Sequence, residues 1–278
     1  MTRFPYGLIV FSMLTPGLVL SQAKPPAPAQ QQGEGNRTAT ISALPKVPVL
    51  TPPDSTYHLP VGETFVYAAQ WRVFPAGVVT LRMEQAGKEI RVVGAADAAG
   101  AVGLLYHVHD RYESFLDPAT FCSRNTSRTV EEGFRRVSTN ITFDYQRGKS
   151  YLEHKNLKKN ELRRAENDIP SCVTDVLSVV YYAGSLPLQP GKTYSFPVND
   201  GGRTVTVELH VEAREQIKTP AGTFNAIRVQ PDAPSEVFKD RPKIWIWYSD
   251  DAARRPVQIR VRMSWGMMTF ILQRVDKK

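Results

Sequence analysis

The feature that most constrains this chain is a strict alternation of apolar and polar residues in several long segments. In residues 203–213, for example, valine and leucine alternate with threonine, glutamate and histidine. A period of two residues places the apolar side chains on one face of a β-strand and the polar side chains on the other. The same pattern occurs in segments 79–84, 137–145 and 256–263. We therefore expect long strands with one buried face.

Short turn sequences punctuate these segments, at residues 86–88, 146–148, 199–202 and 219–222. Long strands joined by short turns predict an antiparallel meander, and a sheet of about ten such strands has to curl. The predicted fold class is all-β: one large curled antiparallel sheet, a half-barrel or open barrel. The concave face of such a sheet is filled by a helix, by its own side chains or by a ligand.

One segment, residues 170–184, has helical rather than strand periodicity. Its apolar residues follow the spacing of a single helical stripe. They are Val173, Val176, Leu177, Val180 and Tyr181. Ser171 is suited to cap the start of this helix and Gly184 to end it. We expect one short helix that plugs the concave face.

The N-terminal region predicts export. Residues 1–23 have a basic start, an apolar run and a small-residue cleavage site, which is typical of a signal peptide. Residues 24–55, rich in proline and glutamine, are expected to be a disordered leader, and residues 56–278 a single β domain. The expected location is the periplasm, without a lipid anchor and without a transmembrane segment in the mature protein. An uncleaved membrane anchor is the alternative.

The chain has two cysteines, Cys122 and Cys172. In an exported protein such a pair predicts a disulfide, here closing a loop of about 50 residues. The alternative is that Cys172, placed at a helix N-terminus, is a nucleophile with His154 as its base. The disulfide is the favoured interpretation.

Other signs of chemistry are weak. His107 and His109 share one face of a strand, as zinc ligands can, but no third and fourth ligand are visible by spacing. The usual catalytic and nucleotide-binding motifs are absent. We expect no metal, no cofactor and no enzymatic activity. A glycan-acting hydrolase is the third functional hypothesis, and it requires a carboxylate pair in the concavity.

Tryptophans suggest a binding surface. In the segment 243–249, Trp245 and Trp247 share one face and isoleucines occupy the other, so the strand is covered on both sides or lines a cavity. The predicted ligand-binding residues are tryptophans and a methionine as lining, with two arginines at the rim. They are Trp71, Trp245, Trp247, Met267, Arg260 and Arg262. Core packing is the alternative role for the tryptophans.

Four segments, in this order, resemble the domain of unknown function 3108 family. They are VGETFVYAAQWRVFPAGVVTLRM, DVLSVVYYAGSLPLQPGKTYSFPVNDGG, TPAGTFNAIRV and WYSDDAARRPVQIRVRMSWGMMTFIL. The resemblance covers roughly residues 57–275. It implies an exported bacterial envelope protein with long antiparallel strands, and it brings no established activity. The shape implied is similar to that of half-barrel lipoprotein carriers.

The functional hypothesis is a periplasmic cell-envelope protein that binds a lipid or other apolar envelope molecule in the concavity of its sheet. A structural or interaction protein with a filled core is the alternative. The formal net charge of +8 also favours contact with an anionic envelope surface. Because no nucleic-acid-binding module is recognisable, we expect no nucleic-acid partner.

Overall fold

A computed structural model describes residues 48–233 and 242–277. Its strands and two helices are β1 (Glu63–Trp71), β2 (Phe74–Ala86), β3 (Glu89–Ala98), α1 (Gly100–Leu105), β4 (Val108–Leu116), β5 (Ser123–Glu132), β6 (Arg135–Asp144), β7 (Lys149–Asn156), β8 (Glu161–Asp168), β9 (Thr174–Asp175), α2 (Val179–Ser185), β10 (Thr193–Asp200), β11 (Arg203–Thr219), β12 (Gly222–Asp232), β13 (Lys243–Ser249), β14 (Pro256–Met263) and β15 (Gly266–Lys277).

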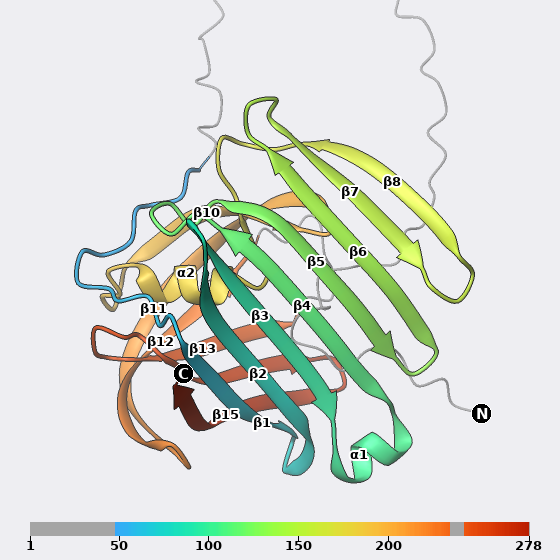
Figure 1. The fold of residues 1–278 in the computed structure, drawn as a ribbon. Helices are drawn as coiled ribbons and strands as arrows, with labels where there is room; N and C mark the ends of the chain where they lie inside the picture. Colours follow the sequence, from blue (N-terminus) through green and yellow to red (C-terminus); the bar gives the residue numbers. More distant parts are fainter. Residues whose placement is uncertain (1–47, 234–241, 278) are drawn as a thin grey trace, which may run out of the picture.

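All of these strands belong to one curled sheet that does not close on itself (Figure 1). A first arm runs from β1 to β8 and a second arm from β15 back to β9, and the arms join where β1 pairs with β15. The pairs are antiparallel except for β9 and β10, which run parallel. The predicted fold class, a large curled antiparallel sheet, is confirmed.

Helix α2 lies inside the curl, and we call the face of the sheet that it contacts the inner face (Figure 1). Its Tyr181 ring stacks on Phe65 of β1 at 6.1 Å, and its Tyr182 ring meets Phe196 of β10 edge-on at 4.9 Å. The Tyr248 hydroxyl of β13 donates to the Val180 carbonyl at 2.6 Å. A helix therefore fills the apolar part of the concavity, as the sequence predicts.

The helix is shorter than the predicted 170–184, because it begins only at Val179. The residues before Val179 form hydrogen bonds with distant strands instead. The Val173 carbonyl accepts from the Ser123 amide at 2.9 Å, and Thr174 pairs with β10. Asp175 then turns the chain by accepting the amide of Ser178 at 3.0 Å. These long-range hydrogen bonds outcompete the helical ones. Cys172 is consequently not at the first turn of a helix.

The structure adds a second short helix, α1, which the sequence did not predict. It connects β3 to β4, and two of its side chains, Leu104 and Leu105, are 90% and 88% exposed.

The predicted signal peptide, residues 1–23, lies outside the described residues, as does most of the predicted leader. The last leader residues, 48–55, contact α2: the Thr51 amide donates to the Tyr182 hydroxyl at 2.8 Å, and the Asp54 amide to the Ser185 carbonyl at 2.7 Å. This end of the leader is thus held against the helix.

Candidate functional site

The structure brings five of the six predicted ligand-binding residues onto one face. Residues directly opposite each other on paired strands share a face. Arg260 lies opposite Trp245, and Arg262 lies opposite Met267. The side chains also stack diagonally, with the Arg260 guanidinium 5.2 Å from the Trp247 ring centre and that of Arg262 5.5 Å from the Trp245 ring centre.

This shared face is not the face that contacts α2. The residues that alternate with this group along β13 and β14, including Tyr248 and Ile259, are buried on the inner face. Arg260 and Arg262, in contrast, are exposed. Trp247 is nevertheless only 4% exposed, and its Nε1 donates to Glu215 at 3.1 Å. The tryptophans of β13 are therefore outside the concavity, beneath arginine side chains.

The sixth predicted residue, Trp71, lies on the opposite face from this group. It pairs with Met268, which is buried in the core, and its ring lies 6.2 Å from that of Trp265. The six residues thus do not line one cavity. Their role in ligand binding stays a prediction.

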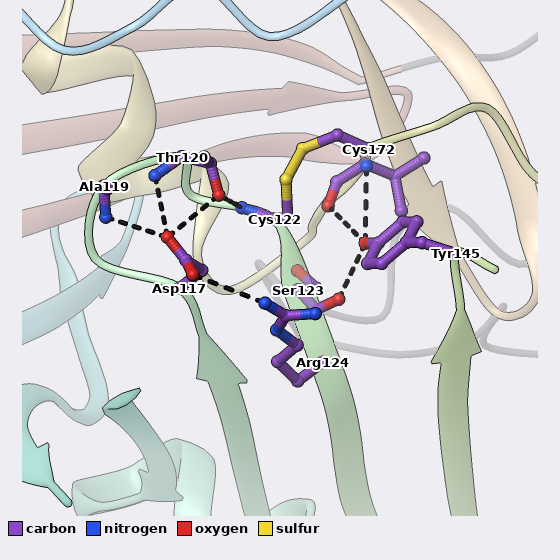
Figure 2. Close-up of polar contacts among 9 residues, drawn as sticks. Asp117, Ala119, Thr120, Cys122, Ser123, Arg124, Tyr145 and Cys172 are labelled. Carbon is purple, nitrogen blue, oxygen red and sulfur yellow. Dashed lines mark hydrogen bonds and ion pairs between the residues drawn. A yellow bond between two sulfur atoms is a disulfide. The ribbon is translucent and has the colours of Figure 1, made fainter. Parts of the chain in front are cut away.

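The predicted disulfide is present between Cys122 and Cys172, with Cα atoms 5.2 Å apart, which leaves neither cysteine as a free nucleophile (Figure 2). Beside it, the Tyr145 hydroxyl donates to the Ser123 carbonyl at 2.7 Å and accepts from the Val173 amide at 3.4 Å. The bridge therefore fastens the chain just before β9, in the second arm, to the start of β5 in the first arm.

Asp175 extends this attachment into the interior. Its Oδ2 accepts hydrogen bonds from Ser114 of β4 and Ser123 of β5, both at 2.6 Å. Its Oδ1 accepts the amides of Leu177 and Ser178. A buried carboxylate with this many donors is fully satisfied, so its function is to hold the two arms together.

Next to Asp175, a narrow cleft opens between the inner face of β4–β6 and the end of β10. It encloses about 340 Å³ of empty space, including the part open to solvent. Thirteen residues line it, and most of them are of polar type. They are Tyr112, Glu113, Thr126, Ser127, Arg128, Thr139, Asp175, Asn199 and Asp200, with Ile141, Val176, Leu177 and Gly201 completing the lining.

A buried ion pair crosses this cleft from one arm to the other. The Arg128 guanidinium of β5 lies 3.7 Å from Asp200 Oδ1 of β10, and both residues are less than 10% exposed. Neither the Arg128 Nε nor the Asp200 Oδ1 has a hydrogen-bond partner among the described residues. Burial raises the pKa of Asp200, and the Arg128 charge opposes this shift. Both atoms are therefore buried in the cleft wall without a hydrogen bond to any described residue.

A second polar group, Asp110 and Glu132, lies on the same inner face at the far end of β4 and β5. Both are at most 4% exposed, and each perturbs the ionisation of the other. Burial raises the pKa of Asp110 to about 6, whereas burial and then the Asp110 charge raise the pKa of Glu132 to about 7. Arg135 lies 3.9 Å from Glu132 and opposes both shifts. The pair holds a proton near neutral pH.

His154 of β7 continues the polar surface. Its Nδ1 lies 2.8 Å from the Thr139 hydroxyl, and burial, followed by the charges of Arg128 and Arg135, lowers its pKa. The imidazole is therefore kept neutral. The other histidine pair considered from sequence, His107 and His109, stacks at 6.4 Å between ring centres, and the described residues contain no cluster of three potential metal ligands.

Sequence reasoning missed these buried charges, although the alternation carries a signal for them. Asp110 has the phase of Val108 and Tyr112, and Arg128 and Glu132 have the phase of Val130. A charged residue that occupies an apolar position of an alternating strand points inward. That rule would have identified this site.

Comparison with solved structures shows the fold. A β-barrel-like protein of domain of unknown function DUF1849 from Brucella abortus has 9% identity and a TM-score of 0.53, covering 80% of this chain and 99% of its own. A protein described as exported, with a YmcC-like fold, from Bacteroides fragilis has 10% identity and a TM-score of 0.35. It covers 80% of this chain and 98% of its own.

A protein described as a lipoprotein, from Parabacteroides distasonis, has 10% identity and a TM-score of 0.30, again covering 80% of this chain and 98% of its own. The last two resemble this fold too distantly to support an inference.

No curated protein matches the sequence. No helix in the described part of the chain is long and apolar enough to cross a membrane. The family model for "Protein of unknown function (DUF3108)" matches residues 66–273, which is most of the sheet. The chain therefore belongs to the DUF3108 family.

Proposed function

We propose that this protein is an exported cell-envelope protein that binds the polar group of an amphipathic envelope molecule in the cleft between β4–β6 and β10. The observation that carries the proposal is the Arg128–Asp200 pair, which is buried in the cleft wall with hydrogen-bonding atoms left unused. Buried polar groups in native proteins usually have partners, and unused ones in a cleft are suited to a ligand.

The distribution of apolar and polar side chains restricts the ligand. Around α2 the inner face is occupied by packed aromatic rings, including Tyr181, Tyr182 and Phe196. This end resembles a filled core and gives an apolar chain no room. The cleft, in contrast, presents Arg128, Asp200 and threonine hydroxyls, which suit a headgroup that combines an anionic group with hydroxyls.

Export is supported by the disulfide, since such bonds persist in oxidising compartments. It is supported as well by the signal-like residues 1–23. The absence of enzymatic activity stays a prediction.

The test is native mass spectrometry of the protein exported to a bacterial periplasm and purified gently without reductant. We expect an additional mass that identifies the bound molecule. Replacing Arg128→Gln should remove that mass, because the donor facing the cleft is weakened. Thr126→Leu should also remove it, by filling the cleft while leaving the ion pair in place.

Thr129→Leu is the matched control, because residue 129 lies on the same strand with the opposite phase and does not line the cleft. It should retain the additional mass. A wild-type protein that is always recovered bare would contradict the proposal. It would favour the second candidate, a structural or interaction protein, which the packing of α2 against both arms supports.

A further inference from the structure

The exposed apolar side chains of this protein are concentrated at one end of the sheet. In an antiparallel meander, the β1–β2, β3–β4, β5–β6 and β7–β8 connections all lie at the same end, here along the lower and right margin of Figure 1. We call these connections the turn rim. Of the ten large hydrophobic residues that are exposed in the described chain, five belong to it and three more lie on the adjoining strands β2 and β8. They are Val73, Phe74 and Val78, then Leu104 and Leu105, then Phe134, and finally Leu157 and Leu162.

The turn rim is one continuous structure. The Ala99 amide, just before α1, donates to Ala76 of β2 at 3.1 Å, and the Gly133 amide donates to His107 at 2.9 Å. At the next turn, the Lys158 ammonium lies 5.2 Å from the centre of the Phe134 ring. Each connection thus touches its neighbour, and the exposed side chains form one row.

Exposure at these positions is extreme. Phe134 is 91% exposed, Leu104 90% and Leu105 88%. Single exposed apolar residues are ordinary on protein surfaces, but a set that gathers at one end marks an interaction site. Protruding Leu and Phe side chains of this kind suit insertion among lipid headgroups.

Cations accompany the row. Arg72 lies at the β1–β2 turn, and Lys158 and Lys159 lie at the β7–β8 turn. No carboxylate of a described residue is recorded within ion-pair distance of any of the three, although the exposed Glu161 begins β8 close by in the chain. Cations without a carboxylate partner, next to apolar side chains, complement a surface whose outer layer is anionic and whose interior is apolar.

We propose that the turn rim docks the protein on an anionic phospholipid bilayer. Leu104, Leu105 and Phe134 insert between the headgroups, and Arg72, Lys158 and Lys159 contact the lipid phosphates. A bilayer fits better than a protein partner because the apolar residues protrude from separate turns and cations lie at both ends of their row. A protein interface has a packed, charge-depleted centre. The site is separate from the cleft and does not depend on its occupancy.

The experiment is vesicle flotation of the exported, unreduced protein. Vesicles of phosphatidylethanolamine with phosphatidylglycerol are compared with vesicles of phosphatidylcholine alone. We expect at least about tenfold stronger partitioning onto the anionic vesicles, because basic side chains are attracted to an anionic lipid surface. The double variant Lys158→Gln/Lys159→Gln should remove most of that preference.

The triple variant Leu104→Ser/Leu105→Ser/Phe134→Ser should lose at least about tenfold in partitioning, since three inserted side chains are removed. Val49→Ser/Val61→Ser is the matched control, because these two exposed residues lie outside the turn rim. It should bind within about twofold of wild type. All of these positions are exposed, so thermal unfolding midpoints should not change.

Two results would overturn the proposal. One is a triple variant that partitions like wild type, which would place the contact elsewhere on the protein. The other is a wild-type protein that does not float with anionic vesicles at all, which would exclude a bilayer as the partner of this surface. Neither result would affect the ligand detected by native mass spectrometry, so the two proposals fail independently.

Discussion

The inner face of the curled sheet is filled differently at its two ends. Around α2, aromatic side chains from both arms pack on the helix, and Phe65, Tyr181 and Phe196 are each at most 2% exposed. Toward the turn rim, β4 and β5 instead carry Asp110, Arg128 and Glu132 inward. The comparison indicates that the α2 end supplies stability, whereas the polar end keeps buried groups that packing alone does not require.

The largest expected effect comes from opening the apolar end. Phe196→Ala removes a fully buried ring that contacts Tyr182, and it should lower the free energy of unfolding by about 4–5 kcal/mol. Urea denaturation of the unreduced protein measures this. Thr126→Leu in the empty cleft should change the same quantity by less than about 1 kcal/mol. Equal losses for both variants would remove the distinction between the two ends.

The disulfide lies at the boundary between these regions, and its loss should have the next largest effect. Cys122→Ser/Cys172→Ser releases a loop that spans 50 residues, so the free energy of unfolding should fall by about 4 kcal/mol in the chain-entropy estimate. The measurement is denaturation of the double variant beside oxidised wild type. A loss below about 1 kcal/mol would mean that Asp175 and Tyr145 hold the arms together without the bridge.

The polar end should make the free energy of unfolding depend on pH. The pKa of Asp110 is raised to about 6 and that of Glu132 to about 7, both above their ordinary values of 3.8 and 4.5. The folded protein therefore holds a proton that the unfolded chain releases, and this stabilisation is lost as pH rises from about 4 to about 7. A shift of about two pKa units corresponds to about 3 kcal/mol.

Asp110→Asn isolates this contribution, because an amide can still accept the Glu131 amide hydrogen bond that Asp110 accepts at 3.0 Å. Unfolding midpoints measured across this pH range should fall less steeply for the variant than for wild type. The lowered pKa of His154 acts in the opposite direction in both proteins, so it cancels in the difference. Parallel pH profiles would show that the pair is not protonated in the fold.

Much of the fold follows from local pattern. Alternation predicts strands because backbone geometry imposes it, and two cysteines in an exported chain predict one bridge. The start of α2 does not follow, since Val173 and Thr174 form hydrogen bonds with residues far away in sequence. The site was missed for a related reason. Which arm faces Arg128 depends on the curl, and no local pattern pairs residue 128 with Asp200.

The pairing of β1 with β15 has a consequence for how this protein is made. β1 is the first strand of the described chain and β15 is the last, and the two are neighbours in the sheet. One edge of β1 therefore stays unpaired until residues 266–277 have been synthesised. Before that point the chain has two open sheet edges that the finished sheet lacks, one on β1 and one on β14, each able to recruit a strand from another molecule. Folding must also close a contact between distant parts of the chain, which is slow.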